Sequence, residues 1–103
     1  TPASVLAPAL MACAGPGPVG LFHLACRGET SAWNWIAHAA NRVGIPLNAR
    51  PVTRAQLGGA WRPSRSCLDS TKFGNAWGIQ LPEWDVALDD VLAGWTPSDW
   101  SVA

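Results

Sequence analysis

Proline and glycine positions constrain the fold of this chain most, because they limit the length of each regular element. Gly15-Pro16-Gly17-Pro18 predicts a loop, since each of these residues opposes regular structure. Gly44 and Gly78 each follow a helical pattern and predict helix ends, and Gly58-Gly59 predicts a flexible connection. A chain of 103 residues is large enough for one small domain with a modest core, but not for two.

Between these breaks, the apolar patterns predict a small mixed α/β lobe of about four helices and two to three short strands. We expect one helix within residues 5–14 that begins near Pro8, a proline being tolerated in the first turn. Further helices are expected at Ala32–Val43, at Thr71–Trp77 and near 83–93. Strands are expected at 20–25 and at 45–52. Residues 1–94 would form the lobe and 95–103 a tail.

Polar residues at the starts of these helices predict caps, and apolar residues at helical spacing predict buried faces. Thr30 or Ser31 is expected to cap the helix at 32–43, and Asp69 or Ser70 the helix at 71–77. Two helices carry a predicted buried stripe: Trp35, Ile36, Ala39, Ala40 and Val43 in one, and Trp84, Leu88, Val91 and Leu92 in the other.

The formal net charge is zero, so no overall field favours nucleic acid or an anionic membrane as a partner. No apolar run approaches the roughly 20 residues that span a bilayer, and the first residues lack the basic region of a secretory signal. Cys13, Cys26 and Cys67 are widely spaced and form no zinc pattern, which predicts mostly buried, reduced thiols in a cytoplasmic protein. We expect His23 to be a packed histidine in the first strand.

The stretch at 61–72 (WRPSRSCLDSTK) is the strongest candidate binding site. Arg62 and Arg65 carry guanidinium groups, whose paired donors suit phosphate or carboxylate. Pro63 restricts the backbone between them, and Ser64 and Ser66 add hydroxyl groups. The alternative interpretation is a solvated loop that leads into a helix.

No complete catalytic constellation and no metal site is predicted. The chain lacks the GxGxxG fingerprint, the P-loop, GxSxG and HExxH, and it contains no tyrosine. Asp89 and Asp90 are adjacent on a predicted helix and face different directions, so they do not form a catalytic pair.

Three segments resemble the carboxy-terminal part of dTDP-4-dehydrorhamnose reductases, which belong to the extended short-chain dehydrogenase/reductase family. They are 20–25 (GLFHLA) with 28–31 (GETS), 62–69 (RPSRSCLD) with Lys72, and 78–84 (GIQLPEW). The second is similar to the family pattern R-P-x-N-S-x-L-D-x-x-K, with Arg65 in place of the asparagine. Ala32 stands where the family has a tryptophan, and Trp33 follows one place later.

The resemblance implies a substrate-binding lobe without its cofactor domain. The dTDP-sugar would then contact Arg62, Pro63, Arg65 and Ser66. Thr30, Ser31, Trp33, Asp69 and Lys72 would support that site. The resemblance implies NAD(P)H only for the intact enzyme, whose Rossmann domain carries the Tyr-x-x-x-Lys pair, and no cofactor bound by this chain.

Two other functions remain open at this point. One is a stand-alone, non-catalytic module that binds a sugar nucleotide or regulates. The other is a carbohydrate-binding domain that stacks sugars on some of the seven tryptophans. We also expect apolar surface near 5–11 to be exposed and to favour a homo-oligomer.

Overall fold

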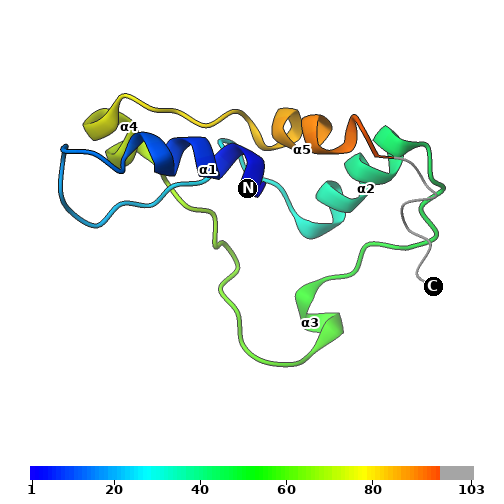
Figure 1. Cartoon of the computed structure of the whole chain (residues 1–103). Coiled ribbons are helices and arrows are strands. Elements are labelled where there is room, and N and C mark those ends of the chain that lie inside the picture. Colours follow the sequence, from blue (N-terminus) through cyan, green and yellow to red (C-terminus); the bar gives the residue numbers. More distant parts are fainter. Residues whose placement is uncertain (96–103) are drawn as a thin grey trace.

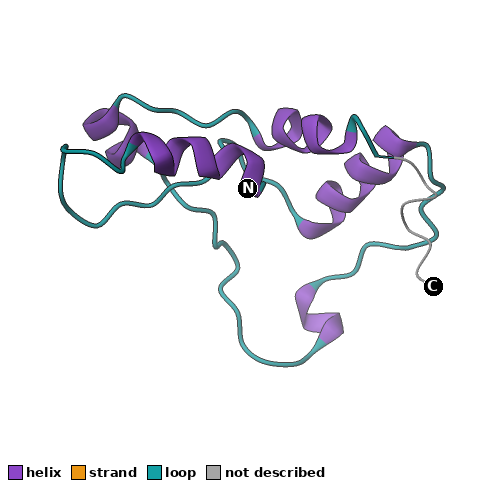
Figure 2. Ribbon diagram, viewed as in Figure 1, coloured by secondary structure: helices purple, strands orange, loops and turns teal. Residues whose placement is uncertain are grey.

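The computed structural model describes residues 1–95, and these form five helices connected by long loops (Figures 1 and 2). The helices are α1 (Ala3–Ala12), α2 (Ala32–Val43), α3 (Arg54–Leu57), α4 (Thr71–Trp77) and α5 (Trp84–Leu92). Figure 1 shows α1 and α4 toward one end of the molecule and α2 and α5 toward the other. The predicted tail beyond residue 95 lies outside the described residues.

The local signals at α2 are confirmed. The side chain of Ser31 accepts a hydrogen bond from the backbone N–H of Asn34, so Ser31 is the N-cap. Gly44 closes the helix in the left-handed conformation (φ 73°), where a glycine meets no steric penalty. Helix α4 has both predicted ends, and Gly78 closes it in the same conformation.

The start of α1 was predicted wrongly. The helix begins at Ala3, and Pro8 lies inside it rather than in its first turn. A proline inside a helix removes one backbone hydrogen bond and costs about 3 kcal/mol. Alanines and leucines, which favour helices, surround Pro8, and Ala9 is buried in the core. Both features stabilise the helix and offset part of this cost.

The sequence interpretation missed α3. Thr53 and Gln56 form a reciprocal capping box, in which the Thr53 side chain accepts from the Gln56 backbone and the Gln56 side chain accepts from the Thr53 backbone. The pattern T-x-x-Q is a recognised helix-start signal and was available in the sequence.

Neither predicted strand forms, so the mixed α/β fold class is wrong in its strands. Within residues 1–95, the backbone pairing is limited to one isolated parallel bridge between Arg27 and Glu83. Side-chain hydroxyl groups accept hydrogen bonds from two backbone N–H groups of the 20–27 segment instead. Ser70 Oγ accepts from the Ala25 N–H at 2.9 Å, and Thr1 Oγ1 accepts from the Cys26 N–H at 3.0 Å. The segment at 45–52 has no regular structure, and its two prolines lack the N–H groups that a ladder needs.

The core is small. Its buried apolar residues come from α1, α4, α5 and the segment before α5: Ala9, Phe73, Leu81, Ala87 and Leu88. Phe22 packs edge-on against Phe73, with ring centroids 5.9 Å apart.

The stripe predicted on α2 is not buried: Trp35 is 46% exposed and Ile36 is 45% exposed. Helix α2 instead contacts α5 through polar groups. On α5 the prediction holds for Leu88, which is buried, but Val91 is about half exposed.

Two predictions about burial in the loops are also wrong. His23 is exposed rather than packed. Its neighbours Phe22 and Leu24 are half-buried, and in a strand-like segment successive side chains point to opposite sides, so His23 points to solvent. Cys13 and Cys26 are half-buried and Cys67 is exposed, so the thiols are free as predicted but not mostly buried.

The fold is open. Its radius of gyration is 16.8 Å, whereas a compact domain of this length has a value of about 13 Å. The segment between α2 and α4, which includes α3, lies apart from the other helices (Figure 1). In the described part of the chain, none of the helices is both long and apolar enough to cross a membrane.

Candidate functional site

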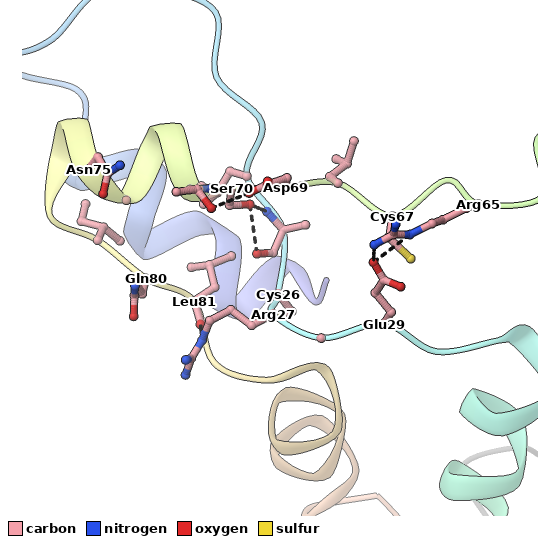
Figure 3. A pocket seen from close by; sticks show the side chains of 17 residues that line it. Cys26, Arg27, Glu29, Arg65, Cys67, Asp69, Ser70, Asn75, Gln80 and Leu81 are labelled. Atoms are coloured by element: carbon pink, nitrogen blue, oxygen red, sulfur yellow. Dashed lines mark hydrogen bonds and ion pairs between the residues drawn. The ribbon is translucent and has the colours of Figure 1, made fainter.

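A cavity of about 460 Å³ lies where three segments distant in sequence meet. Its walls come from residues 24–29, from Arg65 and 67–71 together with Gly74 and Asn75 of α4, and from 79–81. Figure 3 shows Arg65, Cys67 and Glu29 at one side of this cavity and Asn75 and Gln80 at the other.

Hydrogen bonds between the walls hold the three segments together. Ser70 Oγ accepts from the Ala25 N–H at 2.9 Å and contacts the Ala25 carbonyl oxygen at 3.4 Å. Arg27 donates from Nε to the Leu81 carbonyl oxygen at 2.9 Å, and its backbone N–H donates to the carbonyl oxygen of Pro82. The cavity is therefore a product of tertiary contacts rather than of one loop.

Arg65 is bound to Glu29 across the mouth of the cavity. Its Nε donates to Glu29 Oε1 at 2.9 Å, and its Nη2 donates to the same oxygen. The hydrogen bond and the negative charge of Glu29 raise the pKa of Arg65 above its ordinary value, so the guanidinium stays charged. Both side chains are largely exposed to solvent.

Asp69 organises the start of α4 at the edge of the same cavity. Its Oδ1 accepts from the Thr71 hydroxyl at 2.6 Å and from the Thr71 backbone N–H at 2.9 Å. These two hydrogen bonds hold the pKa of Asp69 below its ordinary value. The predicted alternative, Ser70, occupies the N-cap position, but its side chain makes no capping hydrogen bond.

The structure brings together only part of the predicted substrate-binding set. Arg65 lines the cavity, whereas Arg62, Pro63 and Ser66 are exposed and line neither of the two cavities described here. Among residues 1–95, no carboxylate pairs with Arg62.

The predicted supporting residues are spread over the molecule. Asp69 lines the first cavity, and Ser31 caps α2. Lys72 donates to the Leu21 carbonyl oxygen at 2.9 Å and lies 5.1 Å from the centre of the Phe22 ring. Trp33 is half-buried and lines neither cavity.

Thr30 lines a second, more apolar cavity of about 490 Å³ beside α5. Its lining includes Trp35, Trp84 and Leu88. The residues that border both cavities are Ala25, Cys26, Gly28, Cys67 and Leu68. The two cavities are therefore neighbours, separated by the segments at 25–28 and 67–68.

Sequence reasoning missed several polar residues of the first cavity: Arg27, Glu29, Asn75 and Gln80. Ser70 lies within the predicted 61–72 stretch but was predicted only as a helix cap. Glu29 had a local signal, since it is a charged residue beside the turn glycine Gly28. Arg27, Asn75 and Gln80 lacked one, because their polar groups converge only through contacts between distant segments.

The first cavity gathers charged and amide side chains. Its lining includes two guanidinium groups, Arg27 and Arg65, two carboxylates, Glu29 and Asp69, and the amide side chains of Asn75 and Gln80. Within the described residues, no group of three or more His, Cys, Asp or Glu side chains is placed to hold a metal ion.

The chain is thus a mostly helical lobe with a polar cavity formed by distant segments. Comparison with known families identifies its class: the chain belongs to the family described as RmlD substrate binding domain, whose model matches residues 1–96. The resemblance found in the sequence is thereby confirmed.

The similar curated proteins are reductases. The chain is 35% identical over 85 residues to the dTDP-4-dehydrorhamnose reductase of Escherichia coli (strain K12), and the match covers 75% of this chain. The dTDP-4-dehydrorhamnose reductase of Shigella flexneri matches with the same identity and coverage. The match spans 28% of the length of these relatives. No solved structure matches the chain.

Proposed function

We propose that this chain is the sugar-nucleotide-binding part of a dTDP-4-dehydrorhamnose reductase, which reduces dTDP-4-dehydro-L-rhamnose to dTDP-L-rhamnose with NAD(P)H. The family match over residues 1–96 carries this proposal. The relatives are named as reductases, and such a reaction needs a hydride donor. The resemblance assigns NAD(P)H and the Tyr-x-x-x-Lys pair to a Rossmann domain, so this chain would contribute only to substrate binding.

In this proposal the arginines of the 61–72 loop hold the diphosphate of the ligand. Arg62 is exposed and has no carboxylate partner among residues 1–95, so its donors are available to a phosphate. Arg65 lies at the cavity mouth, where it would contact the same ligand. Pro63 limits the conformations of the loop between them, and Ser66 supplies a hydroxyl group.

The remaining predicted residues would support this loop rather than contact the ligand. Asp69 accepts a hydrogen bond from Thr71, the first residue of α4, and Lys72 of α4 donates to the carbonyl oxygen of Leu21. Thr30, Ser31 and Trp33 lie at the start of α2, on the chain that follows Glu29. The placement of these residues supports a role in maintaining the shape of the binding site.

A titration of the chain with dTDP and, separately, with NADPH tests the proposal. Isothermal titration calorimetry is the measurement, and circular dichroism verifies that the helices are present. We expect saturable binding of dTDP and no binding of NADPH. Binding of NADPH, or no detectable binding of dTDP by the helical chain, would contradict the proposal.

The DNA that precedes the codon for Thr1 separates the reductase from a stand-alone binding module. An in-frame segment that encodes a Rossmann domain supports the reductase. If dTDP binds but no such segment exists, the non-catalytic module becomes the better interpretation.

A further inference from the structure

We propose that Glu29 competes with the phosphate groups of the ligand for the guanidinium of Arg65, and so limits the affinity of this site for a nucleoside diphosphate. The inference rests on the proposed function and adds a residue that regulates the same site. It concerns one contact across the mouth of the first cavity.

The geometry shows that Glu29 occupies donors that a phosphate would use. Arg65 directs both Nε and Nη2 at one oxygen of Glu29, Oε1. These two N–H groups form one of the two edges of the guanidinium that can make paired hydrogen bonds with an oxyanion. A phosphate can reach that edge only when the carboxylate moves away.

Exposure makes this displacement feasible. The side chain of Arg65 is 75% exposed and that of Glu29 is 50% exposed. Exposed ion pairs contribute little to stability, since water and salt screen them. A diphosphate carries more negative charge than one carboxylate, so it is the stronger partner for the guanidinium.

Two cavity arginines are paired with carboxylates, Arg65 with Glu29 and Arg27 with Glu83, and the two carboxylates differ in position. Glu29 and Arg65 both line the cavity, so an anion that enters it meets the negative charge of Glu29 directly. Glu83, the partner of Arg27 at 3.7 Å, does not line the cavity. Removal of the Glu29 charge should therefore free Arg65 for the ligand.

The test compares dTDP binding by the wild-type chain and by Glu29→Gln, which keeps the shape of the side chain and removes its charge. We expect Glu29→Gln to bind dTDP about two- to fivefold more tightly in calorimetric titrations at constant ionic strength, a range typical of an exposed ion pair. Asp90→Asn is the matched control, because it removes one negative charge from an exposed site on α5 outside both cavities. This control should leave the affinity unchanged.

A second pair of variants tests whether the gain depends on Arg65. In the background of Arg65→Ala, the substitution Glu29→Gln should change the affinity by much less than it does in the wild type. An equal gain in both backgrounds would show that the effect is general electrostatics and would overturn the inference. The backbone amide spectrum of each variant verifies that the fold is retained.

The outcomes separate this inference from the proposed function. If the wild-type chain binds dTDP and Glu29→Gln binds it no more tightly, the inference fails while the proposed function stands. If neither protein binds dTDP, both fail. Tighter binding by Glu29→Gln together with an unchanged Asp90→Asn control supports both.

Discussion

Two arginines of one short loop lie in different environments. Arg65 is paired with Glu29, whereas Arg62, three positions earlier, has no carboxylate partner among residues 1–95. The free guanidinium of Arg62 can bind an anion without giving up an existing contact. The paired guanidinium of Arg65 must first exchange one partner for another.

Substitution of Arg62 by alanine should therefore weaken dTDP binding. We expect a loss of at least about fivefold in affinity, because a charge-assisted contact to phosphate is stronger than a neutral hydrogen bond. Calorimetric titration is the measurement. Arg50→Ala is the matched control, since Arg50 is also exposed but lies in the loop before α3. Unchanged affinity in Arg62→Ala, or an equal loss in the control, would remove Arg62 from the site.

At the scale of elements, α2 is held by polar contacts. It contains no buried residue, and it contacts α5 through His38 and Arg42. His38 Nε2 donates to Asp89 Oδ1 at 2.8 Å, and Arg42 Nε lies 3.4 Å from the same oxygen. The ring of His38 also packs edge-on against Trp84, at 5.3 Å between centroids. His38 and Arg42 of α2 therefore both contact Asp89 of α5.

Replacement of Asp89 by alanine should destabilise the packing of α2 on α5. We expect a decrease of about 1 kcal/mol in the free energy of unfolding, since two partly exposed polar contacts are lost. Urea denaturation followed by circular dichroism measures it. Asp90→Ala is the control, because it removes the same group from the next position, which is exposed and outside the ion pairs described here. Equal effects of the two substitutions would show that the cross-helix contacts contribute nothing.

At the scale of the whole molecule, the chain exposes more surface than a self-sufficient domain. Its accessible surface is 7923 Å², whereas a folded monomer of its mass, 10.9 kDa, exposes about 5,600 Å². Several large apolar side chains contribute to the excess, among them Met11 at 73% and Leu21 at 79% exposed. The sequence predicted exposed apolar surface near residues 5–11, and Leu10 and Met11 at the end of that segment are exposed.

Self-association of the isolated chain should follow from this surface, because large exposed apolar patches favour pairing. Multi-angle light scattering over a range of concentrations measures it, and we expect the average mass to rise above that of one chain. Met11→Gln should reduce the association if α1 contributes to the contact. A constant monomer mass up to the highest concentration would contradict this expectation.

The sequence by itself determined the helices whose signals are local. Ser31 and Gly44 delimit α2, and Gly78 ends α4, because caps and left-handed glycines act within a few residues. The family resemblance likewise depended on residues that lie in order along the chain. Local signals also had limits, since Pro8 pointed to a helix start five residues later than the true one.

Only the tertiary structure decided the rest. A strand needs a partner at the right distance, and the 20–27 segment meets hydroxyl groups and a single bridge instead. Burial of Trp35 or His23 depends on what covers each side chain, which periodicity does not specify. The contact of Arg65 with Glu29 joins residues 36 positions apart, so the carboxylate beside Arg65 is identified only once the chain is folded.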